Sequence, residues 1–88
     1  LCISLEGRLD TTTAPELEKV LDGRLEGVTE LTFDMSALDY LSSAGLRILL
    51  GAQKTMNKQG SMKVVKVNET IMEIFEVTGF ADILTIEP

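Results

Sequence analysis

Residues 31–56 read LTFDMSALDYLSSAGLRILLGAQKTM, and they carry the clearest strand and helix patterns of the chain. It begins with an apolar, β-prone segment, Leu31–Phe33, which predicts a buried strand over residues 30–34. Further on, apolar residues recur at the spacing of one helix face, at Ala44, Ile48, Ala52 and Met56. We expect the residues between the two patterns, 35–41, to form a short polar connection. The sequence therefore predicts a strand followed closely by a helix.

Two adjacent hydroxyl side chains, Ser42 and Ser43, fall where the N-cap and the first turn of this helix are expected. Serine is a preferred N-cap because its hydroxyl accepts a hydrogen bond from a backbone N–H that has no partner within the helix. One hydroxyl can serve this purpose, which leaves the other facing outward. A phosphate there would meet free N–H groups and the positive end of the helix dipole, an interaction favourable by about 0.3–2 kcal/mol. The pair is a candidate phosphoacceptor; the alternative is that both serines only cap the helix.

The rest of the chain alternates between strand and helix patterns. Further strands are predicted over residues 1–6, 62–67 and 83–86, and helices over residues 14–26, 43–59 and 69–78. Gly7–Asp10 is expected to turn the chain, and Thr13 to cap the first helix in a capping box with Glu16. Asn68 is expected to cap the last helix, and Gly79 to end it.

This order, β-α-β-α-β-α-β with short connections, predicts an α/β fold in which a largely parallel sheet packs against helices. All 88 residues form one domain. Because the chain opens on strand residues without an initiator Met, we expect it to lack an N-terminal strand of the full-length protein. In open parallel sheets, the functional crevice lies at the carboxyl ends of the strands. Asp10, Asp34 and the Ser42–Ser43 pair each follow a predicted strand, so we expect them to gather on one rim.

Composition argues against several classes of function. The net charge is −6 and the eight Lys and Arg residues form no basic run, so no direct contact with nucleic acid is expected. With no His and one Cys, the chain cannot form an internal disulfide, a His-based metal site or a Ser-His-Asp relay, and we expect neither a metal nor a cofactor. We interpret Cys2 as a small core residue. No apolar run approaches the roughly 18 residues of a membrane span, and no secretory signal is recognised, which favours a cytoplasmic protein.

Three motifs stand out along the chain: Gly7–Asp10, Asp34–Arg47 and Phe75–Phe80. Together they resemble the STAS domain (sulphate transporter and anti-sigma factor antagonist). The resemblance implies a STAS-type sheet of about four to five mostly parallel strands packed against three or four helices. Stand-alone members of this size are anti-sigma factor antagonists. They bind an anti-sigma factor that is also a serine kinase, are switched off by phosphorylation of one serine, and are restored by a PP2C-type phosphatase.

The resemblance also assigns roles to residues of the central motif. The family pattern is commonly Asp-Ser-Ser/Thr-Gly-Leu, and matching its last two residues to Gly45 and Leu46 puts Ser43 on the phosphorylated serine. Ser43 is therefore the predicted phosphorylation site, with Ser42 as second choice. Ser42 replaces the acidic residue of the family, which implies either recognition by a different kinase or no kinase at all. The partner-binding residues implied by the resemblance are Asp10, Thr11, Asp34, Ser42, Ser43, Gly45 and Arg47.

Three alternatives stand beside this hypothesis. Asp10 and Asp34 could form a carboxylate pair for acid–base catalysis, but the chain has no His and no Gly-rich phosphate loop, so we do not expect an enzyme. The chain could instead be a regulatory or scaffolding STAS module of a larger protein, such as an anion transporter or a sensory complex. Nucleotide binding by the domain itself has no support from a Walker-type loop.

Overall fold

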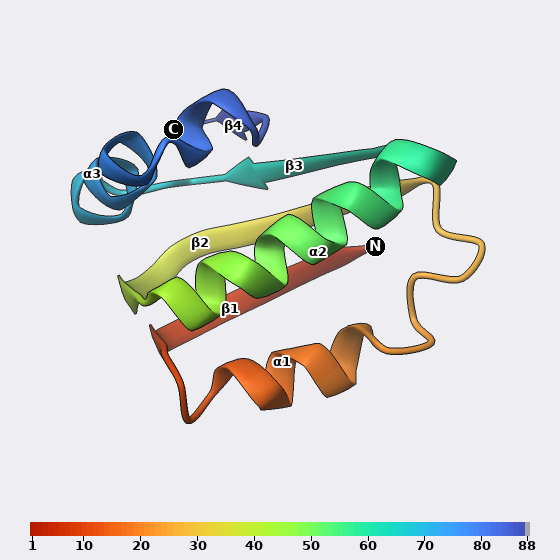
Figure 1. Cartoon of the computed structure of the whole chain (residues 1–88), viewed down its shortest axis with the longest axis horizontal. Helices are drawn as coiled ribbons and strands as arrows, with labels where there is room; N and C mark the ends of the chain where they lie inside the picture. Colours follow the sequence, from red (N-terminus) through yellow and green to blue (C-terminus); the bar gives the residue numbers. More distant parts are fainter. Residues whose placement is uncertain (88) are drawn as a thin grey trace.

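Four parallel strands form one sheet in the order β1-β2-β3-β4 (Figure 1). The computed structural model describes residues 1–87. The strands are β1 (Cys2–Leu9), β2 (Glu30–Leu41), β3 (Ser61–Val65) and β4 (Ile86–Glu87). The helices are α1 (Ala14–Leu21), α2 (Ser43–Gln59), α3 (Glu69–Thr78) and the 3-10 turn η1 (Phe80–Asp82). The predicted α/β class, a parallel sheet packed against helices, is confirmed.

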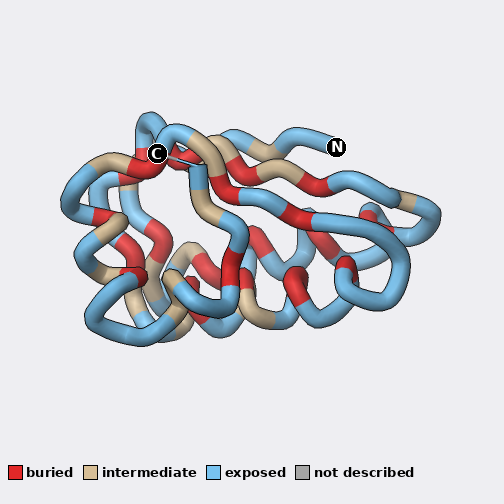
Figure 2. The backbone as a smooth tube through the Cα atoms, turned by 90° about the horizontal axis from the view of Figure 1, so that it is seen from above, coloured by how far each residue is buried: buried red, intermediate tan, exposed pale blue. Residues whose placement is uncertain are grey.

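The hydrophobic core lies on one face of the sheet. More buried and less buried positions alternate along both strands: half-buried with exposed residues in β1 as far as the buried Leu9, and fully buried Leu31, Phe33 and Met35 with half-buried residues in the first half of β2. Figure 1 shows α2 lying across β1 and β2 with α1 alongside, and Figure 2 shows short buried segments alternating with exposed ones along the chain. The alternation puts Cys2 on the opposite, exposed face, so its interpretation as a core residue is wrong.

β2 is longer than predicted, because the residues expected to form a polar connection continue the strand to Leu41. Its register with β1 shifts at two places, and each shift leaves one extra residue in β2, as in a β-bulge. After Met35 the buried residues are therefore three apart, at Leu38 and Leu41, instead of two apart. β1 is also longer than predicted, since the expected turn at Gly7–Asp10 is paired with β2 as far as Leu9.

Two helices have the predicted bounds. α2 runs over residues 43–59, and α3 over residues 69–78. The Asn68 side chain caps α3 by accepting a hydrogen bond from the Ile71 N–H at 2.9 Å, as predicted. Gly79 ends the helix with φ of 82°, a left-handed conformation that glycine adopts without strain. Local capping chemistry is thus sufficient to fix these boundaries.

Three other elements differ from the prediction. β3, predicted over residues 62–67, is Ser61–Val65. α1 ends at Leu21 instead of continuing to residue 26, because Gly23 takes a φ of 79° that a right-handed helix cannot contain. Leu25 is buried all the same, which explains why its spacing suggested a longer helix. The last strand, predicted over residues 83–86, is only Ile86–Glu87, since Ile83 follows the turn η1 directly.

The start of α2 packs directly on the ends of β1 and β2. A Cβ atom at Gly45 would lie 2.7 Å from Leu41 Cδ1 and 2.7 Å from Leu9 Cγ, closer than real Cβ contacts. Gly45 is buried in this contact. The absence of a side chain at this residue is therefore what allows the first turn of the helix to approach the two strands so closely.

We expect Gly45→Ala to lower the free energy of unfolding by about 1–3 kcal/mol, because the added methyl group overpacks the contact with Leu9 and Leu41. Gly51→Ala is the matched control in the same helix, since a Cβ there has nothing within 4 Å. It should raise the free energy of unfolding by about 0.5–1 kcal/mol, the usual gain of alanine over glycine in a helix. Urea denaturation measures both values, and equal gains at the two positions would contradict the packing role of Gly45.

Candidate functional site

The rim at the carboxyl ends of β1 and β2 brings two predicted site segments together. Leu9 and Leu41, the last residues of these strands, are paired neighbours. The Ser42 N–H donates a hydrogen bond to the Leu9 carbonyl oxygen at 2.8 Å. Asp10 follows Leu9, and Ser43 follows Ser42, so the loop after β1 and the start of α2 lie side by side as predicted.

The two serines divide their roles at the start of α2. Ser42 is the N-cap, and its Oγ accepts a long hydrogen bond from the Gly45 N–H at 3.4 Å. Its carbonyl oxygen accepts the first helical hydrogen bond, from the Leu46 N–H at 2.9 Å. Ser43 is the first residue of the helix and is exposed. One hydroxyl caps the helix and the other faces outward, which is the arrangement predicted from the sequence.

Asp10 holds the loop that precedes α1. Its Oδ1 accepts hydrogen bonds from the Thr12 hydroxyl at 2.7 Å, the Thr12 N–H at 3.0 Å and the Thr13 N–H at 3.2 Å. These bonds, led by that from the Thr12 hydroxyl, lower the pKa of Asp10 from 3.8 to about 2. Thr11 lies between these residues and is exposed. Asp10 therefore carries its negative charge at the rim throughout the physiological pH range.

The predicted capping box at the start of α1 is wrong. Thr13 occupies the N-cap position but makes no side-chain cap bond. Its hydroxyl donates instead to the Arg8 carbonyl oxygen at 2.9 Å and accepts from the Asp10 N–H at 2.8 Å. The hydroxyl thus closes the loop between β1 and α1, and the Asp10 carboxylate accepts the hydrogen bond from the Thr13 N–H.

Arg8 and Tyr40 are rim residues that the sequence analysis missed. The Arg8 guanidinium lies 4.4 Å from the centre of the Tyr40 ring, and its Nε lies 3.5 Å from Asp10 Oδ2. Both side chains are substantially exposed. A signal was available for Arg8 and Asp10, because residues two apart in an extended segment point to the same side. The position of Tyr40 beside Arg8 could not be predicted, because the residues around Tyr40 were expected to form a connection and not a strand.

Asp34 does not join the rim, which corrects the predicted grouping. It lies within β2 opposite Ser4 of β1, six residues before Asp10 and so about 20 Å away along the strand. Its neighbours Phe33 and Met35 are buried, so its side chain lies on the opposite, open face of the sheet. There the Ser36 N–H, bonded to Oδ1 at 2.9 Å, lowers the pKa of Asp34 with a smaller contribution from Lys66. The carboxylate pair weighed as a catalytic alternative does not form.

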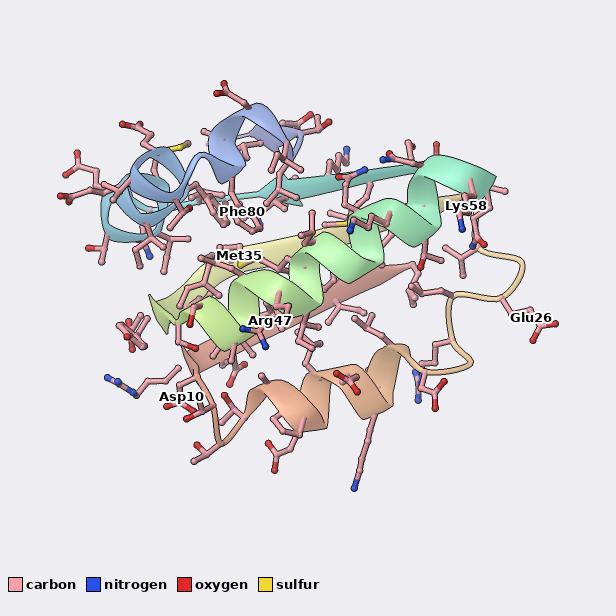
Figure 3. The ribbon with its side chains drawn as sticks, viewed as in Figure 1. Asp10, Glu26, Met35, Arg47, Lys58 and Phe80 are labelled. Atoms are coloured by element: carbon pink, nitrogen blue, oxygen red, sulfur yellow. The ribbon has the colours of Figure 1, made fainter. Side chains whose placement is uncertain are left out.

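Two predicted partner-binding residues lie further along α2. Gly45 is buried, and the structure gives it a packing role; contact with a partner stays a prediction for this residue. Arg47 is exposed, four residues after Ser43, and therefore on the same side of the helix one turn later. Figure 3 shows the Arg47 side chain on the side of α2 that faces α1, and Asp10 at the approach to α1.

Residues 1–87 contain neither a candidate metal site nor a candidate membrane span. Within this range, no group of three or more His, Cys, Asp or Glu side chains is arranged to hold a metal ion. No helix in this part of the chain combines the length and apolarity needed to cross a bilayer. The rim therefore presents an exposed hydroxyl at Ser43, an ionised carboxylate at Asp10 and the exposed side chains of Arg8 and Arg47.

Asp10→Asn should lower the free energy of unfolding at neutral pH, and this difference from wild type should disappear in acid. Because folding lowers the pKa of Asp10, its contribution is fully present above the unfolded value of 3.8 and is lost as the pH falls to about 2. Urea denaturation of wild type and variant between these pH values measures the difference. Asp39→Asn, which removes the same charge from an exposed residue of β2, is the control. A loss for Asp10→Asn that is constant with pH would contradict this assignment.

Comparison with known proteins identifies the family. A family model described as STAS domain matches residues 1–88. The anti-sigma-B factor antagonist of Staphylococcus epidermidis is 32% identical over 84 residues, which span 93% of this chain and 78% of the relative.

Two solved structures have the same fold. An anti-sigma factor antagonist from Mycobacterium paratuberculosis superposes with a TM-score of 0.89 at 27% identity, over 99% of this chain and 75% of that one. A sulfate transporter family protein from Wolinella succinogenes superposes with a TM-score of 0.84 over 98% of this chain and 74% of that one, and at 19% identity this likeness shows the fold alone. By its sequence over residues 1–88 and by its parallel sheet, the chain belongs to the STAS domain family.

Proposed function

We propose that this chain is an anti-sigma factor antagonist, switched off by phosphorylation of Ser43. The observation that carries the proposal is the division of roles at the start of α2, where Ser42 caps the helix and Ser43 is left exposed at its first position. The role itself is supported by relatives named anti-sigma factor antagonists, at 32% identity in sequence and 27% in the superposed structure.

The proposed contact surface is the rim around Ser43. It includes the loop of Asp10 and Thr11, the exposed hydroxyl of Ser43 and the side chain of Arg47 one helical turn on. In the unmodified state this surface docks on the anti-sigma factor, which then releases its sigma factor. The anti-sigma factor is also the serine kinase in this proposal, a PP2C-type phosphatase removes the phosphate, and the exchange takes place in the cytoplasm. This chain binds and is modified but catalyses no step.

The switch is electrostatic. A phosphate on Ser43 adds about −1.5 to −2 charges at the centre of the contact surface. The neighbouring loop already carries the ionised Asp10, and the whole chain has a net charge of −6. The first turn of α2 stabilises the phosphate within the domain, so no change of fold is needed. The added charge repels an acidic or desolvated partner surface and so weakens the complex.

Ser43→Asp should bind the anti-sigma factor at least about tenfold more weakly than Ser43→Ala, because it adds charge where a partner must be desolvated. Isothermal titration calorimetry with the purified cognate anti-sigma factor measures both affinities. Ser61→Asp is the matched control, since Ser61 is exposed at the start of β3, at the opposite end of the sheet. This variant should bind like wild type.

Two outcomes would contradict the proposal in different ways. Equal affinities for Ser43→Asp and Ser43→Ala would remove Ser43 as the switch while leaving the antagonist role. A wild-type protein that fails to bind the anti-sigma factor would contradict the antagonist role and favour a regulatory module of a larger protein.

A further inference from the structure

A groove runs between α1 and α2, beside the rim. The two helices lie next to one another on the same side of the sheet (Figure 1), and the groove has a volume of about 830 Å³. Apolar side chains from both helices and from the loop after α1 line it, namely Leu21, Leu25, Ile48 and Ala52. It reaches the proposed contact surface at Arg47, which belongs to both.

Gly51 is the unusual residue of this groove. It lies in the middle of α2 and is exposed, and a Cβ there would have nothing within 4 Å. Among the seven glycines, four take a positive φ and two, Gly45 and Gly60, lie too close to other atoms to carry a Cβ. Gly51 alone has neither a positive φ nor a close neighbour that would exclude a Cβ. Glycine nevertheless weakens a helix relative to alanine. The fold of the isolated domain therefore gives no reason for a glycine at this residue, whereas a partner that approaches the helix closely would.

The charged side chains along the groove indicate that such a partner is positively charged. Carboxylates outnumber cations among the lining residues, which include Glu18, Lys19, Asp22, Glu26 and Arg47. Glu18 and Asp22 are four residues apart on the α1 side, and both are exposed. With apolar residues on its floor and an excess of acids on one wall, the groove is complementary to an amphipathic segment that carries Lys or Arg.

We propose that this groove binds a cationic amphipathic segment of the anti-sigma factor, with an apolar side chain of that segment seated over Gly51 and its cations facing Glu18 and Asp22. The inference rests on the proposed function, because it names a second contact for the same partner. This second contact differs from the rim around Ser43, because its affinity for the partner depends on the space above Gly51 and on the acidic side chains of Glu18 and Asp22. The groove extends the contact from the start of α2 to its middle.

The test is the affinity of Gly51→Leu for the purified cognate anti-sigma factor, measured by isothermal titration calorimetry. Leucine fills the space over the helix, and we expect binding to weaken about tenfold or more. Thermal unfolding checks that the variant is folded. A second variant, Glu18→Gln/Asp22→Asn, changes only exposed side chains and should weaken binding and reduce its dependence on salt. Its matched control is Glu73→Gln/Glu76→Gln, which neutralises two exposed acids on α3 and should bind like wild type.

The outcomes separate this proposal from the proposed function. If wild type binds and both groove variants bind equally well, the groove proposal is wrong and the antagonist role stands. If wild type does not bind the anti-sigma factor, both are wrong. A wild-type dimer that Gly51→Leu dissociates, with unchanged affinity for the anti-sigma factor, would assign the groove to a second copy of this chain and overturn the proposal.

Discussion

The close contact of Gly45 with Leu9 and Leu41 fixes the geometry on which the site depends. The helix starts so near the ends of the two strands that a single methyl group on Gly45 would already collide with Leu9 and Leu41. The Ser42 N–H bonded to the Leu9 carbonyl oxygen adds a polar tie at the same place. Ser42 is therefore held at the cap, and Ser43 must be the first residue of the helix that faces solvent.

The parts of the fold that could be predicted are those determined by local chemistry. α2 and α3 have regular apolar spacing, hydroxyl or amide caps and a glycine at the end, and their bounds follow from these signals alone. The parallel order of the strands follows from their alternation with helices. Because the roles of Ser42 and Ser43 depend only on where α2 begins, this part of the site could be predicted as well.

The parts that could not be predicted depend on pairing between distant segments. Two bulges change the spacing of buried residues in β2 from two to three, and such a spacing does not suggest a strand when read by itself. The misplacement of Asp34 follows directly, since it was assigned to the end of a strand that continues to Leu41. The stacking of Arg8 on Tyr40 needs the same register, and so it becomes visible only in the paired sheet.

Capping by Ser42 leaves Ser43 as the proposed phosphoacceptor of an anti-sigma factor antagonist. Phosphopeptide mass spectrometry on the protein purified from its native host tests it most directly, because fragmentation distinguishes the two adjacent serines. We expect phosphate on Ser43, and none on Ser42. Phosphate on Ser42, or a chain that stays unmodified under all growth conditions, would contradict it.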